Sequence, residues 1–368
     1  MSGKYVWWTT QFGKKERDLI EEVFASNFLN DGDFTTRFEN EIAARVGCRH
    51  AVAVSSGTAA LFVAVAAAGV GPGDEVIVPD MTFIASANAV ALAGGAPVLV
   101  DVDPNTLNMD PAAMEKAVTP RTKAVMPVHV SGRGADMPAI MDIARRRGLA
   151  VVEDAAEALM SRRHGRFLGR FGKAGCISFS PNKLITTGQG GMVFTDDDGF
   201  HVRLRELKDQ GRPMRGTGGD DIHPRVGYNF KLTNLQAAVG LGQLDFLDAR
   251  AQRLRDHYRI YHERLGDIVE LRFPGFAIEE GETPQWVDVL AERRDELDKF
   301  LAARGMGCRR FWFPLHTQTP YKADPARFPN ACRVGPKALW LPSAFTLGDS
   351  DIRDVCSAIR EFYGRGTA

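Results

Sequence analysis

A single lysine follows an apolar segment in the stretch GCISFSPNKLITTGQGG, residues 175–191. Lys183 could be a solvated surface residue, a phosphate-binding residue, or a covalent nucleophile that forms a Schiff base with a carbonyl group. It is the one charged residue between Lys173 and Asp196. This isolation favours partial burial, which lowers the pKa of a lysine and makes its neutral amine available. A P-loop is excluded because the glycines follow the lysine and Leu184, rather than Ser or Thr, comes next.

The Schiff-base hypothesis requires partner groups elsewhere in the chain. Pyridoxal phosphate chemistry needs an acidic group that keeps the pyridine nitrogen protonated, and a side chain that packs on the ring. Asp154 ends the apolar run VVED, and Phe83 follows the strand-like segment DEVIVP. Each residue alone is weak support, because an aspartate at a strand end or a phenylalanine in a core is common.

A phosphate site is also predicted. The segment VSSGTAAL places Ser56, Gly57 and Thr58 at a strand-to-helix turn, where free backbone N–H groups can bind an anion. The hydroxyl of Ser178 could add a further hydrogen bond. A turn of this kind is usually only a helix cap. Together with Lys183 and Asp154, in an α/β context, it favours a cofactor site.

Short apolar runs alternate with helical patterns between residues 50 and 198. We expect strands within 50–55, 74–79, 96–103, 123–130 and 149–154, and helices within 58–70, 82–94, 112–118 and 137–148. This alternation is typical of a mostly parallel sheet with helices on both faces. Ligands bind at the carboxyl ends of such strands, where the candidate residues lie.

The remaining segments predict the domain organisation. Helices are expected over 14–28, 34–46 and, as one long helix, 234–265. From about residue 266 the pattern is less regular and indicates a smaller α+β domain. A chain of 368 residues suggests about two domains, which we place at 1–245 and 246–368.

Composition excludes several classes of protein. Lys plus Arg and Asp plus Glu are equal at 46 each, so the charge favours neither nucleic acid nor an acidic membrane surface. The start of the sequence lacks the apolar core of a signal peptide, and no window reaches the length of a membrane span. Five dispersed cysteines indicate free thiols, and no metal-ligand spacing is present. We therefore expect a cytoplasmic protein without a metal.

Five blocks of the sequence, in this order, resemble the sugar aminotransferases of the DegT/StrS type, within the aspartate-aminotransferase (type I pyridoxal phosphate) fold. They are FENEIAARVG, the segment 51–90, VEDAAEA, SFSPNKLITTGQGGMVFTDD and VGYNFKLTNLQAAVGLGQL. The blocks are spread over more than half of the chain, residues 38–244. The resemblance implies an α/β fold with a mostly parallel central sheet and a smaller C-terminal α+β domain, and pyridoxal 5'-phosphate as the cofactor.

The resemblance also implies roles for the candidate residues. Lys183 would hold the cofactor covalently and move the proton during transamination, with pyridoxamine phosphate as the intermediate form. Asp154 would pair with the pyridinium nitrogen, Phe83 would stack on the ring, and Glu157 would lie beside the cofactor. The turn Ser56, Gly57 and Thr58, with Ser178, would bind the phosphate. Asn229, in GYN, would reach the phosphate of the neighbouring subunit, which implies a homodimer with shared active sites.

Within this family the sequence resembles most the group that makes GDP-perosamine from GDP-4-keto-6-deoxymannose, with L-glutamate as donor and 2-oxoglutarate as product. Glu157 and the segment FWFPLHTQTPY carry this resemblance. Asn30 and His316 are candidate contacts to the sugar nucleotide. Departures from the family pattern, expected near the substrate, are Arg133, Gln189, Lys231 and ALMS at 158–161.

Alternatives remain at this stage. The acceptor could be a UDP- or dTDP-linked keto-sugar or another sugar-derived ketone, and the basic pieces at 211–216 and 223–227 could hold its diphosphate. A lysine-dependent enzyme acting on amino acids would need an arginine for the α-carboxylate, and Arg333, Arg353 or Arg360 could serve. A dehydrating relative would have histidine in place of Lys183, and a non-catalytic regulator could lose the lysine or the acid.

Overall fold

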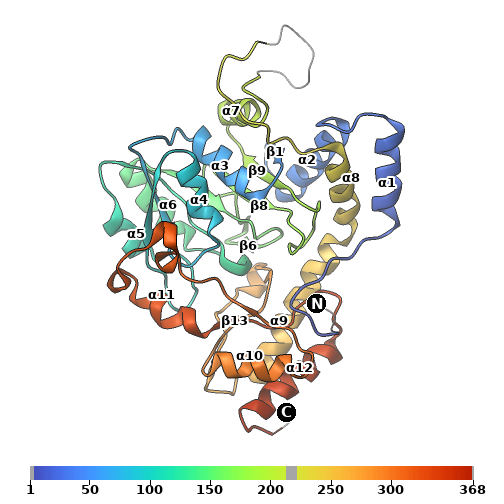
Figure 1. The fold of residues 1–368 in the computed structure, drawn as a ribbon, viewed down its shortest axis with the longest axis vertical. Coiled ribbons are helices and arrows are strands. Elements are labelled where there is room, and N and C mark those ends of the chain that lie inside the picture. The colour runs from blue at the N-terminus through green and yellow to red at the C-terminus, as the bar shows by residue number, and fades with distance from the viewer. Residues whose placement is uncertain (1–3, 213–221, 367–368) are drawn as a thin grey trace.

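The computed structural model describes residues 4–212 and 222–366. A seven-stranded sheet forms the centre of the larger part of the molecule, in the order β1-β9-β8-β5-β4-β2-β3 (Figure 1). Its strands are β1 (His50–Val54), β2 (Glu75–Pro79), β3 (Ala96–Val100), β4 (Thr122–Val125), β5 (Ala150–Asp154), β8 (Ala174–Ser178) and β9 (Gly191–Thr195). Only β9 pairs antiparallel with its neighbours in this sheet. The predicted mostly parallel sheet is confirmed.

Helices cover both faces of this sheet. They are α3 (Gly57–Ala67), α4 (Ala85–Leu92), α5 (Pro111–Ala117), α6 (Met137–Arg147) and α7 (Asp198–Lys208). Side chains alternate between the faces along a strand. In β2, Val76 and Val78 pack in the same apolar cluster as α3, whereas Ile77 packs with Met114 of α5 and Ile140 of α6. Burial on both faces explains why these strands are continuously apolar.

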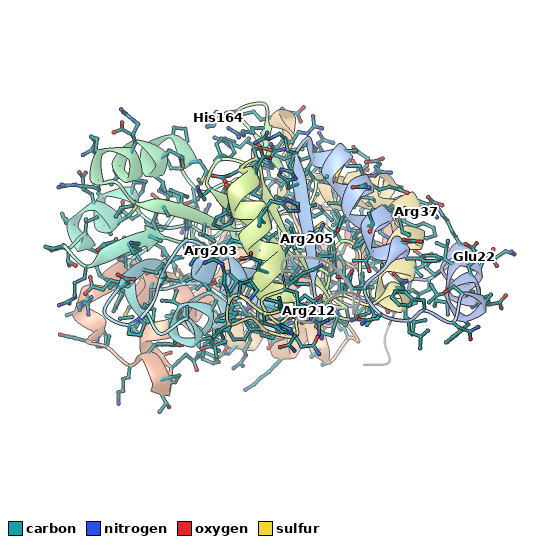
Figure 2. The ribbon with its side chains drawn as sticks, turned by 90° about the horizontal axis from the view of Figure 1, so that it is seen from above. Glu22, Arg37, His164, Arg203, Arg205 and Arg212 are labelled. Atoms are coloured by element: carbon teal, nitrogen blue, oxygen red, sulfur yellow. The ribbon has the colours of Figure 1, made fainter. Side chains whose placement is uncertain are left out.

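Two N-terminal helices pack beside the sheet. They are α1 (Lys14–Ala25) and α2 (Asp33–Val46), and both contact α8 (Asn234–Gln243) (Figure 1). Seen from above, exposed Glu22 of α1 lies at the outer edge and Arg37 of α2 lies closer to the sheet (Figure 2). In the same view Arg203 and Arg205 extend from opposite sides of α7, with Arg205 toward α2.

The C-terminal part contains a second, antiparallel sheet in the order β10-β11-β13-β12. Its strands are β10 (Leu271–Arg272), β11 (Asp288–Ala291), β12 (Arg309–Arg310) and β13 (Ala338–Trp340). Helices α9 (Leu247–Leu265), α10 (Arg294–Ala302), α11 (Pro329–Val334) and α12 (Asp349–Phe362) accompany it, and a short β6 (Arg162–Arg163)–β7 (Arg166–Phe167) hairpin lies between β5 and β8 in the chain. This is the α+β arrangement expected from the sequence.

The predicted single helix over 234–265 is wrong in one respect. A 3-10 turn, Leu244–Phe246, separates α8 from α9. A 3-10 turn keeps similar backbone angles and apolar spacing, so the sequence pattern does not reveal it. We retain the domain boundary between residues 245 and 246 as a proposal. The first described residues cross this boundary, because Tyr5 forms a β-bridge with Met306 and Trp7 stacks on Trp340 at a centroid distance of 6.2 Å.

None of the helices in the two described ranges is both long and apolar enough to span a bilayer.

Candidate active site

A cavity of about 310 Å³ lies at the carboxyl edge of the large sheet. The sequence-predicted residues that line it are Ser56, Gly57, Thr58, Phe83, Asp154, Glu157, Ser178 and Lys183. They lie at the last residue of β1, β2, β5 or β8 or in the segment that follows it. Because the carboxyl ends of parallel strands share one edge of a sheet, segments far apart in the sequence meet here.

Lys183 lies in the cavity with its ammonium group paired. Its Nζ is 3.1 Å from Oε1 of Glu157 and 4.8 Å from the ring centre of Trp286, and 12% of its side chain is exposed. The amide of Gln285 holds the backbone on both sides: its Nε2 donates to the carbonyl of Asn182 at 3.2 Å, and its Oε1 accepts from the N–H of Leu184 at 3.1 Å. The lysine is therefore fixed at the edge of the sheet.

Asp154, the last residue of β5, is buried and 5% exposed. Ser86 Oγ donates to its Oδ2 at 2.7 Å, and the N–H of Ala156 donates to its Oδ1 at 3.1 Å. Burial raises the pKa of this carboxyl group, while its hydrogen bonds and the charges of Lys183 and His129 oppose the increase. A cation placed against Asp154 would further favour its ionised form.

The turn after β1 presents an anion-binding surface. Ser56 caps α3, and its Oγ accepts from the N–H of Ala59 at 3.1 Å. Gly57 and Thr58 begin the helix, so their N–H groups have no acceptor within it. Ser178 also lines this end of the cavity, with its Oγ 3.0 Å from Oγ of Ser180. These donors are suited to a phosphate group.

Two glycines, one at the end of the segment 175–191 and one in the turn itself, allow close packing here. A Cβ at Gly191, the first residue of β9, would lie 2.3 Å from the carbonyl oxygen of Ser56. A Cβ at Gly57 would lie 2.8 Å from Cβ of Ser178. Both distances are shorter than real contacts, so glycine lets β9 and β8 pass directly under the turn.

Glu157 connects the lysine to a loop of the large part. Its Oε1 pairs with Lys183, and its Oε2 accepts from the N–H of Ser131 at 2.9 Å. Only 6% of the residue is exposed. Burial raises the pKa of this carboxyl group, and Lys183 opposes the increase.

Sequence reasoning missed the opposite wall of the cavity, which comes from the C-terminal part. Trp286, Arg309 and Trp312 line it, and the ring centre of Trp312 is 6.3 Å from that of Phe83. Phe83 is 52% exposed, so its ring is available for contact within the cavity. Trp312 lies in the segment FWFPLHTQTPY that carries the family resemblance, but no motif surrounds Trp286 or Arg309, and only tertiary packing brings these two side chains to the site.

His316 is placed differently from the other candidates. It is 3% exposed, stacks on Phe328 and bonds Asp80: its Nδ1 is 2.6 Å from Oδ2, and its N–H donates to Oδ1 at 2.7 Å. Burial raises the pKa of Asp80, and the hydrogen bonds from His316 oppose the increase. The described lining of the cavity does not include His316, so its contact with a sugar nucleotide stays a prediction.

Asn30 and Asn229 are both exposed and do not line the cavity of their own chain. Lys231 Nζ is 2.9 Å from Oδ1 of Asn229 and 2.6 Å from Oδ1 of Asp209. Asp209 also forms a β-bridge with Asn229. The role of Asn229 in a neighbouring subunit and the contact of Asn30 with the sugar nucleotide stay predictions.

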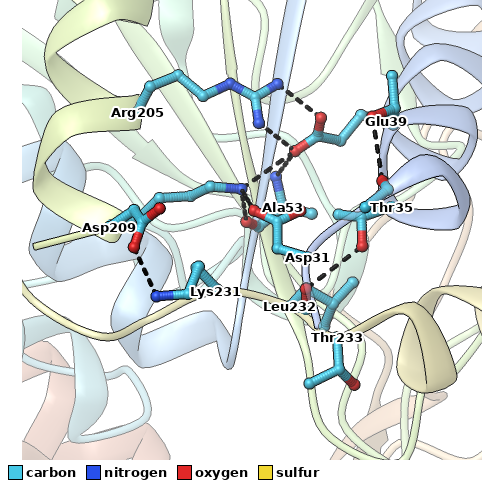
Figure 3. Close-up of polar contacts among 12 residues, drawn as sticks. Asp31, Thr35, Glu39, Ala53, Arg205, Asp209, Lys231, Leu232 and Thr233 are labelled. Carbon is cyan, nitrogen blue, oxygen red and sulfur yellow. Dashed lines mark hydrogen bonds and ion pairs between the residues drawn. The ribbon is translucent and has the colours of Figure 1, made fainter. Parts of the chain in front are cut away.

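A buried ionic network supports the two segments that carry these asparagines (Figure 3). Lys208, 2% exposed, lies 3.0 Å from Oδ2 of Asp31 and 3.5 Å from Oε1 of Glu39, and donates to the carbonyl of Ala53 at 3.0 Å. Arg205 binds both oxygens of Glu39, at 2.9 and 2.6 Å. The network therefore joins α7, α2 and β1 with the segment next to Asn30.

The residues that depart from the family pattern lie in different parts of the structure. Gln189 lines the cavity, as expected. Arg133 is 1% exposed, does not line the cavity, and pairs with Asp288 of β11 at 2.8 Å. Its expected position near the substrate stays a prediction, and the ion pair with Asp288 had no local sequence signal. Of the basic pieces proposed to hold a diphosphate, residues 213–216 lie outside the described residues.

Comparison with known proteins decides the family. The model of the DegT/DnrJ/EryC1/StrS aminotransferase family matches residues 10–360. The chain belongs to this family. It is a pyridoxal-phosphate-dependent sugar aminotransferase.

Several relatives are similar over almost their whole length. The GDP-perosamine synthase of Caulobacter vibrioides is 41% identical over 355 residues, covering 94% of both chains, and that of Escherichia coli O157:H7 is 36% identical, covering 95% of this chain and 96% of the relative. Among solved structures, DesV of S. venezuelae, in complex with a ketimine intermediate, has a TM-score of 0.91 and 36% identity, covering 96% of this chain and 95% of that chain. DesI in the presence of its TDP-sugar product has a TM-score of 0.90 and 32% identity, covering 100% and 95%.

The cavity of this aminotransferase fits its cofactor. Phosphate donors at the start of α3 and a buried carboxylate at the end of β5 line the same space as the amine of Lys183. The absence of a Cβ at Gly57 keeps the anion-binding turn against Ser178. The donor set therefore matches a phosphorylated, cationic pyridine that carries an aldehyde.

Proposed function

We propose that the enzyme transfers the amino group of L-glutamate to a nucleotide-linked 4-keto-6-deoxysugar, and that GDP-4-keto-6-deoxymannose, giving GDP-perosamine, is the acceptor. The observation that supports the reaction is the presence of Lys183 and Asp154 in one cavity with an anion-binding turn. Similarity to GDP-perosamine synthases at 36–41% identity supports the choice of sugar.

In this proposal each residue acts at a stated atom. Lys183 Nζ would hold pyridoxal phosphate covalently, and its released amine would act as the base that removes the proton from the reacting carbon of the amino donor and as the acid that supplies a proton during sugar amination. Asp154 would accept a hydrogen bond from the ring nitrogen, and the N–H groups of Gly57 and Thr58, with Ser56 and Ser178, would bind the phosphate. When bound, the cofactor supplies an electron sink for the carbanion.

Glu157 and Phe83 complete the proposed arrangement. Glu157, 3.1 Å from Lys183 Nζ, would orient the amine. Phe83, which lines the same cavity, would pack on the cofactor ring. The aromatic wall of Trp286 and Trp312 reduces the access of water, which strengthens these electrostatic contacts.

We further propose a homodimer in which each subunit completes the active site of the other. Asn229 is exposed outside its own cavity and Lys231 fixes its side chain, which suits a contact with a phosphate in the partner. Exposed Asn30, which precedes Asp31 of the network around Lys208, would contact the sugar nucleotide there. The molar mass in solution tests the dimer, and an Asn229→Ala protein that keeps its cofactor would contradict the shared site.

A dTDP-linked acceptor is the second candidate. DesI, 32% identical, was solved with its TDP-sugar product. The two candidates differ in the nucleotide, and the proposed chemistry at Lys183 is the same for both.

The reaction is tested with a Lys183→Ala variant. The wild-type protein should show the absorption band of covalently bound pyridoxal phosphate, and L-glutamate should bleach it. Lys183→Ala should lose the band and at least about 1,000-fold of the activity, because both bond and proton carrier are removed. Lys173→Ala is the matched control, since Lys173 is exposed and pairs with Asp197 at 2.6 Å. Turnover by Lys183→Ala would disprove the mechanism.

The acceptor is tested by comparing GDP-, UDP- and dTDP-linked 4-keto-6-deoxysugars with the same glutamate-treated enzyme. Preference for the GDP sugar is expected in kcat/KM. If only a keto acid or a ketone without a nucleotide is aminated, the proposed acceptor class is wrong.

A further inference from the structure

One charged group of the cavity is not used by the proposed mechanism. Lys183 and Glu157 form a pair, and Asp154 is held by Ser86. Arg309 of β12 remains, and it is the one arginine among the described residues that line the cavity. The proposed mechanism therefore assigns no role to the charge of the Arg309 guanidinium group.

Aromatic rings hold this guanidinium group in place. Its Cζ lies 4.6 Å from the ring centre of Trp7 and 5.3 Å from that of Trp340. Both rings are buried, at 8% and 0% exposed. Contact through the planar face leaves the N–H edge of an arginine available for a planar anion.

Within the described part of the chain, no side chain forms an ion pair or hydrogen bond with Arg309. Burial lowers the pKa of its guanidinium group, and the charge of Glu157 opposes this. The neighbouring Arg310 differs: it is exposed, and pairs with Asp295 at 3.2 Å and Asp298 at 3.5 Å. Successive residues of a strand point to opposite sides, so only Arg309 serves the cavity.

We propose that Arg309 binds a carboxylate of the amino donor, and the same carboxylate of the oxo-acid product. The inference rests on the proposed function, because it names the residue that recognises the donor in that reaction. Arg309 is thus a substrate-binding residue that reaches the cavity from the C-terminal part. The arginines suggested by sequence do not line this cavity: Arg333 is exposed, and Arg360 pairs with Asp267 at 2.6 Å.

The position of Arg309 favours a carboxylate over the diphosphate of a nucleotide sugar. In an amino acid the α-carboxylate is attached directly to the carbon that reacts at Lys183. In a 4-keto-sugar the diphosphate is attached to C1, across the ring from the reacting carbon. Arg309 shares a cavity of about 310 Å³ with Lys183, and Glu157, the partner of that lysine, also attracts Arg309. An anion site in the same small cavity as the amine suits the shorter separation.

The half-reaction with glutamate and the half-reaction with the keto-sugar distinguish the two anions that Arg309 could bind, the donor carboxylate and the diphosphate. Single-turnover absorption changes give kmax/KM for glutamate with the pyridoxal form and for the keto-sugar with the pyridoxamine form. For Arg309→Gln we expect a loss of about 10- to 100-fold in the glutamate half-reaction, the worth of a charge-assisted hydrogen bond, and a change below about threefold with the sugar. Calorimetric titration of 2-oxoglutarate into the pyridoxamine form should show a similar increase in Kd.

Arg310→Gln is the matched control and should change neither half-reaction. Arg309→Lys keeps the charge without the planar fork, so an intermediate loss is expected; this variant also serves if Arg309→Gln does not fold, as judged by its circular dichroism. An unchanged Kd for 2-oxoglutarate, or a loss confined to the sugar half-reaction, would overturn the inference. If the wild-type enzyme does not react with glutamate, the proposed function itself fails, which is a distinct result.

Discussion

Nζ of Lys183 and Oε1 of Glu157 lie 3.1 Å apart in a cavity where both side chains are nearly buried. Glu157 also accepts from the backbone of Ser131, so the carboxylate is fixed independently of the lysine. A buried charge pair of this kind is costly to desolvate, and its retention fits a functional use of the lysine. The pair therefore affects stability and chemistry together.

The first prediction concerns Glu157→Gln and the pH dependence of stability. Burial raises the pKa of Glu157 above its ordinary value, so the folded state holds this proton more strongly than the unfolded chain. The stability that protonation provides is then lost as pH rises from about 4.3 to the raised pKa, with a slope of about 1.4 kcal/mol per pH unit. Glutamine cannot ionise. The unfolding temperature of the cofactor-free variant minus that of the cofactor-free wild type should therefore increase with pH over this range and then level off.

Glu75→Gln is the control of opposite sign. Hydrogen bonds from Thr119 and Arg121 lower the pKa of Glu75. Its stabilising effect is therefore present above the unfolded pKa and is lost as pH falls through the folded pKa. Relative to wild type, this variant should become less stable as pH increases. If the unfolding-temperature difference for Glu157→Gln is constant with pH, the raised pKa is wrong.

The sequence was sufficient to predict the large sheet and one side of the site. Asp154 and Lys183 follow apolar strands, and parallel strands bring their carboxyl ends together whatever their separation in sequence. The opposite wall could not be predicted. Trp286 and Arg309 reach the cavity, and Gln285 reaches the backbone beside Lys183, only when the C-terminal part packs against the sheet, and each lies in a segment without a motif.

The contacts of Arg133 are a second feature that could not be predicted from the sequence. A resemblance places residues by their neighbours in the chain, which suggested a position near the substrate. The side chain instead turns toward Asp288, 155 residues away. Ser131 Oγ donates to the same carboxylate at 2.7 Å, so a loop of the large part is bound to β11.

The second prediction is that Arg133→Met destabilises the fold by about 3–5 kcal/mol, because it leaves Asp288 ionisable and unpaired in the interior. Burial already raises the pKa of Asp288, with Arg133 as the largest opposing effect. The double variant Arg133→Met, Asp288→Asn should recover part of the loss. Guanidinium unfolding measures both. Arg145→Met, which breaks the exposed pair with Asp142, should change stability by at most about 1 kcal/mol. Equal effects of the two single variants would contradict the assignment.

The third prediction concerns the network in Figure 3. Lys208→Met removes a buried cation that lies near Asp31 and Glu39, and should cost about 3–5 kcal/mol. If the network positions Asn30 and the segment of Asn229 for a partner subunit, the variant should also lose dimer affinity in analytical ultracentrifugation. Arg203→Met is the control, because Arg203 is exposed on another side of α7. A stable variant with normal dimerisation would show that the network has neither role.

The fourth prediction tests the anion-binding turn through Gly57→Ala. Alanine is favoured within a helix, but here its Cβ would lie 2.8 Å from Cβ of Ser178, so α3 must shift from β8. A shift of this kind costs about 1–3 kcal/mol. If this free energy is lost from the binding of the phosphate, the affinity for the cofactor decreases by about 5- to 150-fold. Equilibrium dialysis of pyridoxal phosphate measures the change. Gly71→Ala is the matched control, since a Cβ there meets nothing within 4 Å. Because the two substitutions add the same methyl group, equal cofactor affinities would place the phosphate away from α3.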